Sequence, residues 1–201
     1  MLKIKRAIMS CSDKSGLLDL ARLLSDFGVE IISTAGTLHT LQEAGIAATS
    51  IADFTGVPEL LDGRVKSLHP KVHAGLLGVR DNKLHVEQMQ GSGFPWIDLV
   101  VANLAPFETL IGQTGMTLDA AIDMVDIGGA AMIRSAAKNF RYVTVVVNPE
   151  RYTTVMHELR AHEGAVSFET RFRLAQEAFA CTANYDRIIV DYLRKMEPQG
   201  R

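Results

Sequence analysis

Apolar residues along the chain follow two periods, and their alternation predicts a succession of strands and helices. Short apolar runs predict strands at 6–10, 29–34, 47–51, 97–104 and 142–147. Leucines recur at positions 17, 18, 20, 23 and 24, which predicts a helix over 16–27. Four further helices are predicted: one that follows the turn at 34–37 and ends at about residue 44, one over 81–90, one over 117–125, and one that the motif at 126–129 opens and that ends at about 138. Two more helices finish the chain. Strands that alternate with helices in this way are typical of an α/β fold.

The last predicted helix, over about 167–194, has a periodic face of aromatic and small residues. Phe172, Ala175, Phe179 and Ala183 recur at helical spacing. This pattern indicates a core or dimer face rather than a cofactor-binding motif.

Composition and charge narrow the class of protein. A chain of 201 residues with 47% hydrophobic content can bury a full core, as one large domain or one domain with a small appendage. A net charge of −2 argues against nucleic acid as the main partner. Two distant cysteines, Cys11 and Cys181, suit a reducing cytosol, and neither a signal peptide nor an apolar run of about 18 residues is evident. We therefore expect a cytoplasmic protein with no membrane association.

The most unusual stretch is 62–70, Asp-Gly-Arg-Val-Lys-Ser-Leu-His-Pro. Gly63 and Pro70 indicate turns at its two ends. In an extended segment Arg64 and Lys66 point in the same direction, because side chains alternate with a period of two. Two cations aimed at one place favour an anionic ligand, although a solvated basic loop has the same composition.

Two turns between a predicted strand and a predicted helix have the composition of anion sites. The first is Ser12-Asp13-Lys14-Ser15-Gly16, whose capping side chains leave backbone N–H groups near a helix start. The second is Thr34-Ala35-Gly36-Thr37, which lacks the lysine of a Walker loop but offers a glycine and hydroxyl donors, with Ser33 directly before it. Both turns follow strands, where ligands of open α/β folds bind.

His69 and His73, four residues apart, invite a metal-binding interpretation, which we reject. Pro70 is expected to spoil a helix that carries both imidazoles on one face, and the glutamate of the zinc-protease pattern is absent. We expect no metal and no cofactor.

A carboxylate and two glycines, Asp126-Ile127-Gly128-Gly129, precede a predicted helix. They place an acid beside exposed backbone N–H groups, and Asp126 could equally be a plain helix cap. Lys138 follows twelve residues later, about 18 Å along a straight helix, so spacing alone does not bring it to the same place. Asn103 ends the buried strand over 97–104.

Six motifs in register resemble one known family, the inosine monophosphate (IMP) cyclohydrolase domain of the bifunctional purine-biosynthesis protein. They are 12–16, 33–37, 62–71, 103–107, 126–129 and 134–139. The resemblance implies a methylglyoxal-synthase-like α/β fold: a mainly parallel sheet with helices on both faces and extra C-terminal helices. It implies a single domain over 1–201, with a core at about 5–150 and helices at about 150–195, and the formyltransferase domain of the family is absent.

The resemblance also implies a reaction, the dehydrative ring closure of 5-formamidoimidazole-4-carboxamide ribotide to IMP. The roles that it implies are catalysis by Lys66, Asp126 and Lys138, with Lys66 on the developing oxyanion, Asp126 on the carboxamide and Lys138 as a proton shuttle. The substrate-binding positions that it implies are Ser12, Asp13, Lys14, Ser33, Thr34, Ala35, Gly36, Thr37, Arg64, Val65, Ser67, Ala102, Asn103, Ile127 and Gly128. Candidate protein partners are a separate formyltransferase chain and a second copy in a homodimer.

The chain departs from the family pattern at four positions. It has Ala105 where the family has Tyr, Ala35 where it has Gly, Ser67 where it has Thr, and Ala130 where it has Pro. The change at Ala105 removes a phenol from the reacting atoms. Two other functions therefore stay open, a non-catalytic nucleotide sensor of the same fold and a lyase of the methylglyoxal synthase type.

Overall fold

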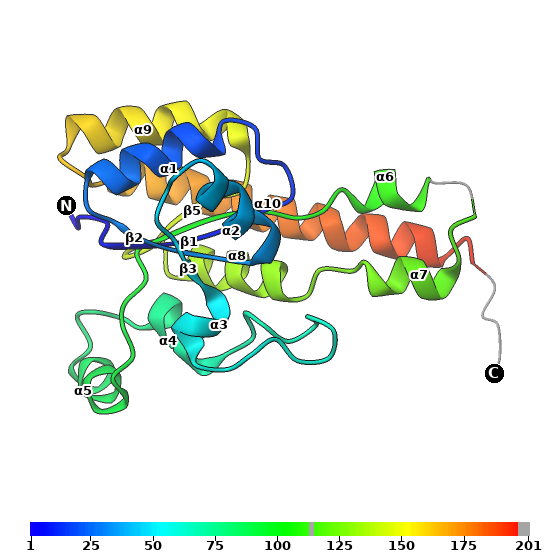
Figure 1. The fold of residues 1–201 in the computed structure, drawn as a ribbon, viewed down its shortest axis with the longest axis horizontal. Helices are drawn as coiled ribbons and strands as arrows, with labels where there is room; N and C mark the ends of the chain where they lie inside the picture. The colour runs from blue at the N-terminus through cyan, green and yellow to red at the C-terminus, as the bar shows by residue number, and fades with distance from the viewer. Residues whose placement is uncertain (113–114, 197–201) are drawn as a thin grey trace.

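The computed structural model describes residues 1–112 and 115–196, and a parallel sheet of five strands lies at its centre (Figure 1). The strand order is β3-β2-β1-β4-β5, and every neighbouring pair is parallel. The strands are β1 (Arg6–Cys11), β2 (Glu30–Ser33), β3 (Thr49–Ser50), β4 (Leu99–Asn103) and β5 (Thr144–Val146). All five predicted strands are present, and the predicted α/β class with a parallel sheet is confirmed.

Helices cover both faces of the sheet because its strands are apolar on both sides. In β1, Ala7 and Met9 face one core cluster and Ile8 faces the other. The first cluster is covered by α1 (Leu17–Asp26), α2 (Ala35–Glu43) and α9 (Tyr152–Ala161), and the second by α3 (Ile51–Thr55), α4 (Pro70–Leu77), α8 (Gly128–Lys138) and α10 (Phe168–Leu193). Figure 1 shows α1 and α9 on one side of the sheet and α3 and α4 on the other.

Three short helices in the described residues were not predicted. They are α3, α4 and α6 (Phe107–Ile111). The strand predicted over 47–51 is shortened to two residues because Ser50 caps α3, its hydroxyl accepting a hydrogen bond of 2.9 Å from the N–H of Asp53. The remaining elements are α5 (Lys83–Ser92), α7 (Leu118–Asp123) and a 3₁₀ turn, η1 (Pro149–Arg151).

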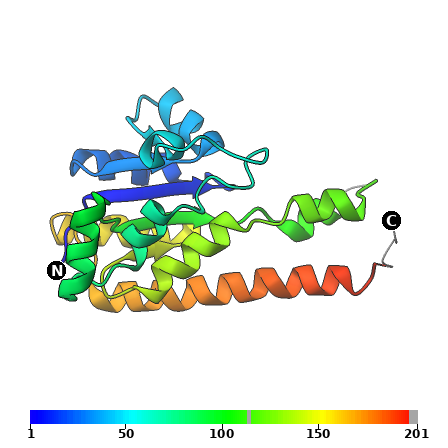
Figure 2. The same cartoon turned by 90° about the horizontal axis from the view of Figure 1, so that it is seen from below.

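The helix α10 continues well beyond the sheet, and α6 and α7 lie along its C-terminal part (Figure 2). A small separate core holds this part together, with Phe107 in edge-to-face contact with Tyr185 and Tyr192. We call α6, α7 and residues 182–193 of α10 the extension. On the periodic face of α10, Ala175 is buried whereas Phe172 and Phe179 are exposed, so only part of that face is core.

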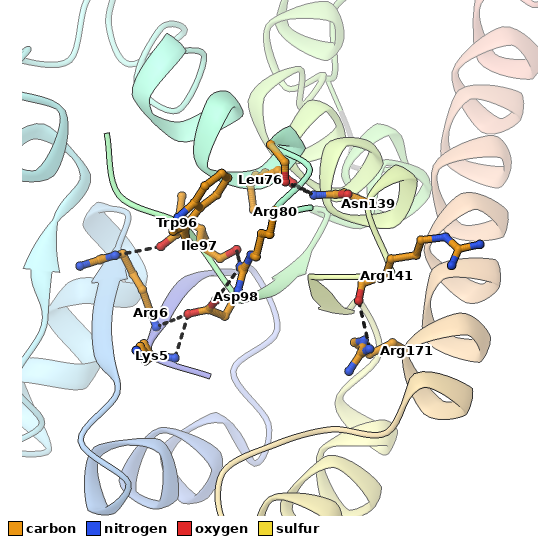
Figure 3. A network of polar contacts seen from close by, with 11 residues as sticks. Lys5, Arg6, Leu76, Arg80, Trp96, Ile97, Asp98, Asn139, Arg141 and Arg171 are labelled. Atoms are coloured by element: carbon orange, nitrogen blue, oxygen red, sulfur yellow. Dashed lines mark hydrogen bonds and ion pairs between the residues drawn. The ribbon is translucent and has the colours of Figure 1, made fainter. Parts of the chain in front are cut away.

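The opposite end of the molecule is fixed by a buried polar network (Figure 3). One carboxylate oxygen of Asp98 accepts hydrogen bonds of 2.8 Å from the backbone N–H groups of Lys5 and Arg6. Its other oxygen pairs with the guanidinium of Arg80 at 2.6 Å. This network joins the start of β1 to the start of β4, away from the strand ends that carry the candidate site.

Among the helices of the described residues, none is both long enough and apolar enough to cross a membrane.

Candidate active site

The strand order reverses between β1 and β4, which makes this place the topological switch point of the sheet. The carboxyl ends of the two strands lie side by side there. From β1 the chain proceeds to β2 and β3 on one side, then returns to β4 and β5 on the other. The side-chain amide of Asn103, at the end of β4, joins the turn after β1 by two hydrogen bonds of 2.8 Å. Its oxygen accepts from the N–H of Asp13, and its nitrogen donates to the carbonyl of Asp13. Open α/β sheets bind ligands at such a point.

A cavity of about 620 Å³ opens beside this edge of the sheet. It is large enough for a ligand of drug or nucleotide size. The hydroxyls of Ser10 and Thr34, 2.9 Å apart, form its inner end. Its lining also includes Gly63, Arg64, Lys66, Ser67, Ala105, Asp123, Asp126, Ile127, Gly128, Gly129, Met132 and Ile189.

A tight turn presents the two predicted cations to the cavity. Leu60 and Val65 pair in antiparallel fashion, with backbone hydrogen bonds of 3.0 and 3.2 Å. The chain reverses between them through three residues of positive φ, Leu61, Asp62 and Gly63. A left-handed conformation is costly for a branched side chain such as Leu61, so the turn stores strain where it aims Arg64 and Lys66.

Arg64 does not stand free in the cavity. Its guanidinium forms an ion pair with the carboxylate of Asp123, which belongs to α7 in the extension. Both side chains are largely exposed, so the pair contributes at most about 1 kcal/mol to stability. An anionic ligand can therefore displace Asp123 from Arg64 at little cost.

Asp126 lies at the start of α8, where the cavity is most crowded. One oxygen of its carboxylate accepts a hydrogen bond of 2.7 Å from the N–H of Gly129 in the first turn of the helix, and the residue also lines the cavity. A Cβ at Gly129 would lie 2.5 Å from the other carboxylate oxygen, and a Cβ at Gly128 would lie 2.5 Å from the hydroxyl of Ser67. A side chain at Gly128 or Gly129 would therefore force Ser67 or the carboxylate of Asp126 to shift.

As predicted, Pro70 keeps one helix from carrying both imidazoles, because His69 lies before the first residue of α4 and only His73 lies inside it. The helix α4 itself was not predicted. Pro70 occupies the first turn of α4, where its missing N–H costs nothing. His69 caps this helix, its Nδ1 accepting a hydrogen bond of 3.1 Å from the N–H of Lys71, and His73 lies inside it with Nδ1 3.0 Å from the Ser135 hydroxyl. Burial lowers the pKa of His73, opposed by a contact with the Ser67 backbone. Across residues 1–112 and 115–196, no three His, Cys, Asp or Glu side chains form a metal-binding group.

Seven of the predicted site residues line the cavity. They are Thr34, Arg64, Lys66, Ser67, Asp126, Ile127 and Gly128. The first turn, with Ser12, Asp13 and Lys14, lies beside it at the end of β1, next to Asn103. Hydrogen bonds from the N–H and hydroxyl of Ser15 lower the pKa of Asp13 and hold this turn.

Other predicted residues serve the fold in this structure. The hydroxyl of Ser33 is buried and donates to the carbonyl of Met9 at 2.8 Å, and that of Thr37 accepts from the N–H of Cys11 at 2.9 Å. These two hydroxyls were predicted to donate to phosphate, but here they join β1 to β2 and α2. Ala102 is buried within β4, and Val65 is part of the tight turn. Ala35 and Gly36 are exposed in the first turn of α2, where Ala35 needs no positive φ.

Lys138 is not brought to the cavity. It is the last residue of α8, whereas Gly128, Gly129 and Met132 at the other end of that helix line the cavity. The separation expected from helix length is therefore realised, and Lys138 is exposed and is not among the residues that line the cavity. Its predicted role as a proton shuttle is not supported by the geometry of one chain.

Sequence reasoning missed the outer wall of the cavity. This wall is formed by Ile122, Asp123 and Ile189 of the extension, together with Met124 and Val125 directly after α7. Ile189 is remote in sequence from every motif, and only the return of α10 past α7 places it there. Asp123 carried a weak signal, since it is an acid close to the Asp-Ile-Gly-Gly motif.

A parallel sheet with a cavity at its switch point, lined by Arg64 and Lys66, defines an α/β protein with a ligand-sized site, and comparison with known families agrees. The chain belongs to the family described as the MGS-like domain, which matches residues 16–131. The family described as the AICARFT/IMPCHase bienzyme matches residues 136–201.

More particularly, the chain is similar to proteins named bifunctional purine biosynthesis protein PurH. It is 54% identical to the one from Chlorobium chlorochromatii over 94% of this chain and 49% identical to the one from Magnetococcus marinus over 100% of it. The chain spans only 36% and 38% of the length of these two relatives. A solved structure titled "Crystal structure of ForH" is 36% identical, with a TM-score of 0.82, and the match covers 93% of this chain and 97% of that one.

Proposed function

We propose that this chain is an IMP cyclohydrolase. The reaction closes the ring of 5-formamidoimidazole-4-carboxamide ribotide and releases water. The observation that carries the proposal is the meeting of Lys66, Ser67 and Asp126 in one nucleotide-sized cavity, within a chain that aligns over nearly its whole length with PurH proteins.

The chemistry requires little beyond positioning and charge stabilisation. The carboxamide nitrogen attacks the formyl carbon, a proton moves from that nitrogen to the former formyl oxygen, and the resulting hydroxyl leaves as water with a second proton. Both reacting groups belong to one molecule, so holding their rotamers supplies much of the rate. Lys66 stabilises the negative charge that develops on the formyl oxygen, and Asp126 orients the carboxamide. Neither step uses a metal or a cofactor.

The phosphate of the ribotide has a natural place at the inner end of the cavity. Backbone N–H groups at the start of α2 carry partial positive charge beside this end. Lys14, in the turn after β1, carries a full positive charge. Arg64 provides a second cation once it leaves Asp123. Charge-assisted hydrogen bonds of this kind are about twice as strong as neutral ones.

The direct test supplies the formylated ribotide to the purified chain and follows IMP formation by absorbance. Ring closure that is abolished by Lys66→Ala and retained by the distant surface variant Asp19→Asn supports the proposal. A chain that binds IMP but never produces it contradicts it.

Ala105 favours one alternative, a non-catalytic nucleotide sensor. It lines the cavity at the place where the family has a tyrosine. The four tyrosines all lie in the part of the chain that the structure describes, and none of them lines the cavity. The hydroxyl of Tyr142, for example, donates to Asp81 at 2.6 Å on the surface. We expect Ala105→Tyr to raise turnover by up to about 10²-fold, since one acid–base group is worth about 10²–10⁴. Absence of ring closure in both proteins, with IMP binding intact, identifies a sensor.

The proposal extends to the surroundings of the chain. The substrate is a formylated amine, so a formyltransferase must supply it, and a separate chain of that activity is the partner that we propose in the cytoplasm. We further propose that residues 1–201 act as one domain and that a second copy completes a homodimer.

A further inference from the structure

A tyrosine of α10 contacts the backbone of the cavity wall. The hydroxyl oxygen of Tyr185 accepts a hydrogen bond of 2.9 Å from the N–H of Asp126. The side chain of Tyr185 is 6% exposed, and Tyr185 is absent from the cavity lining. It can therefore influence a bound ligand only through Asp126.

This contact is one of two that fix the direction of Asp126. The other joins its carboxylate to the N–H of Gly129 at 2.7 Å. The second carboxylate oxygen lies so close to Gly129 that no Cβ fits between them. The carboxylate is thus held directly by the N–H of Gly129, and its own backbone is held by Tyr185 from the side of α10.

Tyr185 is itself fixed by packing. Its ring meets Phe107 edge-to-face, with 6.2 Å between centroids and 69° between planes. Phe107 is 1% exposed, so it cannot move aside without disturbing the core of the extension. The hydroxyl is therefore a rigid acceptor for the N–H of Asp126.

We propose that Tyr185 is a positioning residue of the ring-closing reaction. It holds the peptide of Asp126 so that the carboxylate meets the carboxamide of the substrate in the attacking rotamer. The inference rests on the proposed function, because it assigns Asp126 to the carboxamide.

The chain offers a matched control for this hydroxyl. Tyr192 lies on the same helix, is also 6% exposed and packs edge-to-face on the same Phe107 at 5.6 Å. Within the part of the chain that the structure describes, its hydroxyl has no hydrogen-bond partner. Tyr185→Phe and Tyr192→Phe thus remove the same atom from similar places, and only the first releases Asp126.

The experiment compares ring closure by the parent and the two variants. We expect Tyr185→Phe to lower kcat at least about tenfold, the rate equivalent of one hydrogen bond, with KM changed less than about threefold. Tyr192→Phe should leave both constants as in the parent. Equal kcat in Tyr185→Phe and the parent, or an equal loss in both variants, would overturn the proposal.

Hydrogen exchange of the Asp126 amide, followed by NMR, provides a readout that does not depend on turnover. Exchange of this amide should be faster in Tyr185→Phe than in the parent, and Tyr192→Phe should match the parent. If both variants exchange at the parent's rate, the proposed contact is contradicted. If the parent closes no ring, the proposed function fails. The affinity of the three proteins for IMP then tests whether Tyr185 positions Asp126. Weaker binding in Tyr185→Phe alone supports positioning of Asp126, whereas equal binding in all three proteins overturns it.

Discussion

Lys66 brings a positive charge into a cavity that also contains the carboxylate of Asp126. The ammonium carries three donors on a flexible stem and can follow an oxygen as it becomes negative. Its place follows from the strained turn over 61–63, which presents it beside Arg64. In the ring closure that we propose, Lys66 would therefore stabilise the transition state more than the bound substrate.

We expect Lys66→Ala to lower the rate of ring closure by about 10²–10³-fold, because one donor aimed at developing charge is worth about that much. Affinity for IMP should change less, since the product carries no such charge. Lys66→Arg keeps the charge but changes the geometry, so it should recover only part of the rate. Single-turnover absorbance measurements separate rate from affinity, and a parental rate in Lys66→Ala would remove this residue from the mechanism.

Individual site residues could be predicted where chemistry is concentrated in a short segment. Arg64 and Lys66 stand out because two cations and two turn residues occur together, and the structure places both in the cavity. Lys138 was assigned by resemblance, yet helix geometry alone warned that it lies about 18 Å from Asp126. Asp123 could not be predicted as the partner of Arg64, because their contact depends on how α7 packs against the basic turn.

At the scale of secondary structure, the start of α8 shows how a local motif sets the site. The backbone approaches Ser67 and the Asp126 carboxylate so closely that Gly128 and Gly129 leave no room for a Cβ. The motif was visible in the sequence, but the reason for its glycines was not. For Gly128 the reason lies in Ser67, more than fifty residues away in the chain, and for Gly129 it lies in Asp126 of the motif itself.

We expect Gly129→Ala to displace the Asp126 carboxylate and to lower turnover by up to about 10²-fold, as a misplacement of about 1 Å can. Overpacking should also cost about 1–3 kcal/mol of unfolding free energy. The control is Gly91→Ala in α5, where an added Cβ meets nothing within 4 Å. That variant should keep full activity and gain up to about 1 kcal/mol. Steady-state kinetics and urea unfolding of both proteins check the difference, and equal activities would refute it.

The elements themselves were predicted unequally. Long periodic segments such as α1 and α10 were found with nearly correct ends, because many positions report on one period. The helix α4 was missed because Pro70 was interpreted only as a turn residue, although it occupies the first position of a helix. For the whole α/β arrangement, the repeated order of strand, turn and helix was sufficient.

At the scale of the whole molecule, the buried network around Asp98 maintains the sheet at the end opposite the cavity. We expect Asp98→Asn to lower the free energy of unfolding by about 3–5 kcal/mol, because Arg80 would lose the partner of a buried ion pair. The exposed pair of Arg22 and Asp19 offers a comparison, and Asp19→Asn should cost less than about 1 kcal/mol. Urea unfolding measures both. Similar losses in the two variants would show that burial of Asp98 is unimportant.

Stability should also depend on pH through His73. Burial lowers the pKa of this imidazole in the folded protein, so between the folded and unfolded pKa values the unfolded chain binds more protons. The free energy of unfolding should therefore fall as pH drops below about 6.5, the usual pKa of histidine, until it reaches the folded pKa. His73→Gln removes this group, and its unfolding free energy should depend less on pH between 5 and 7 than that of the parent. Identical pH profiles would contradict the prediction.

The cavity lies between two parts of the chain that have separate hydrophobic cores. Its inner wall belongs to the sheet, and its outer wall belongs to the extension, which is held together by a small core of its own. A unit with few buried contacts opens more readily than the sheet. A nucleotide that touches both walls therefore links occupancy to folding: each bound molecule stabilises the extension by mass action. The concentration of substrate would then set the fraction of molecules in which α7 and the end of α10 are folded against the rest of the protein.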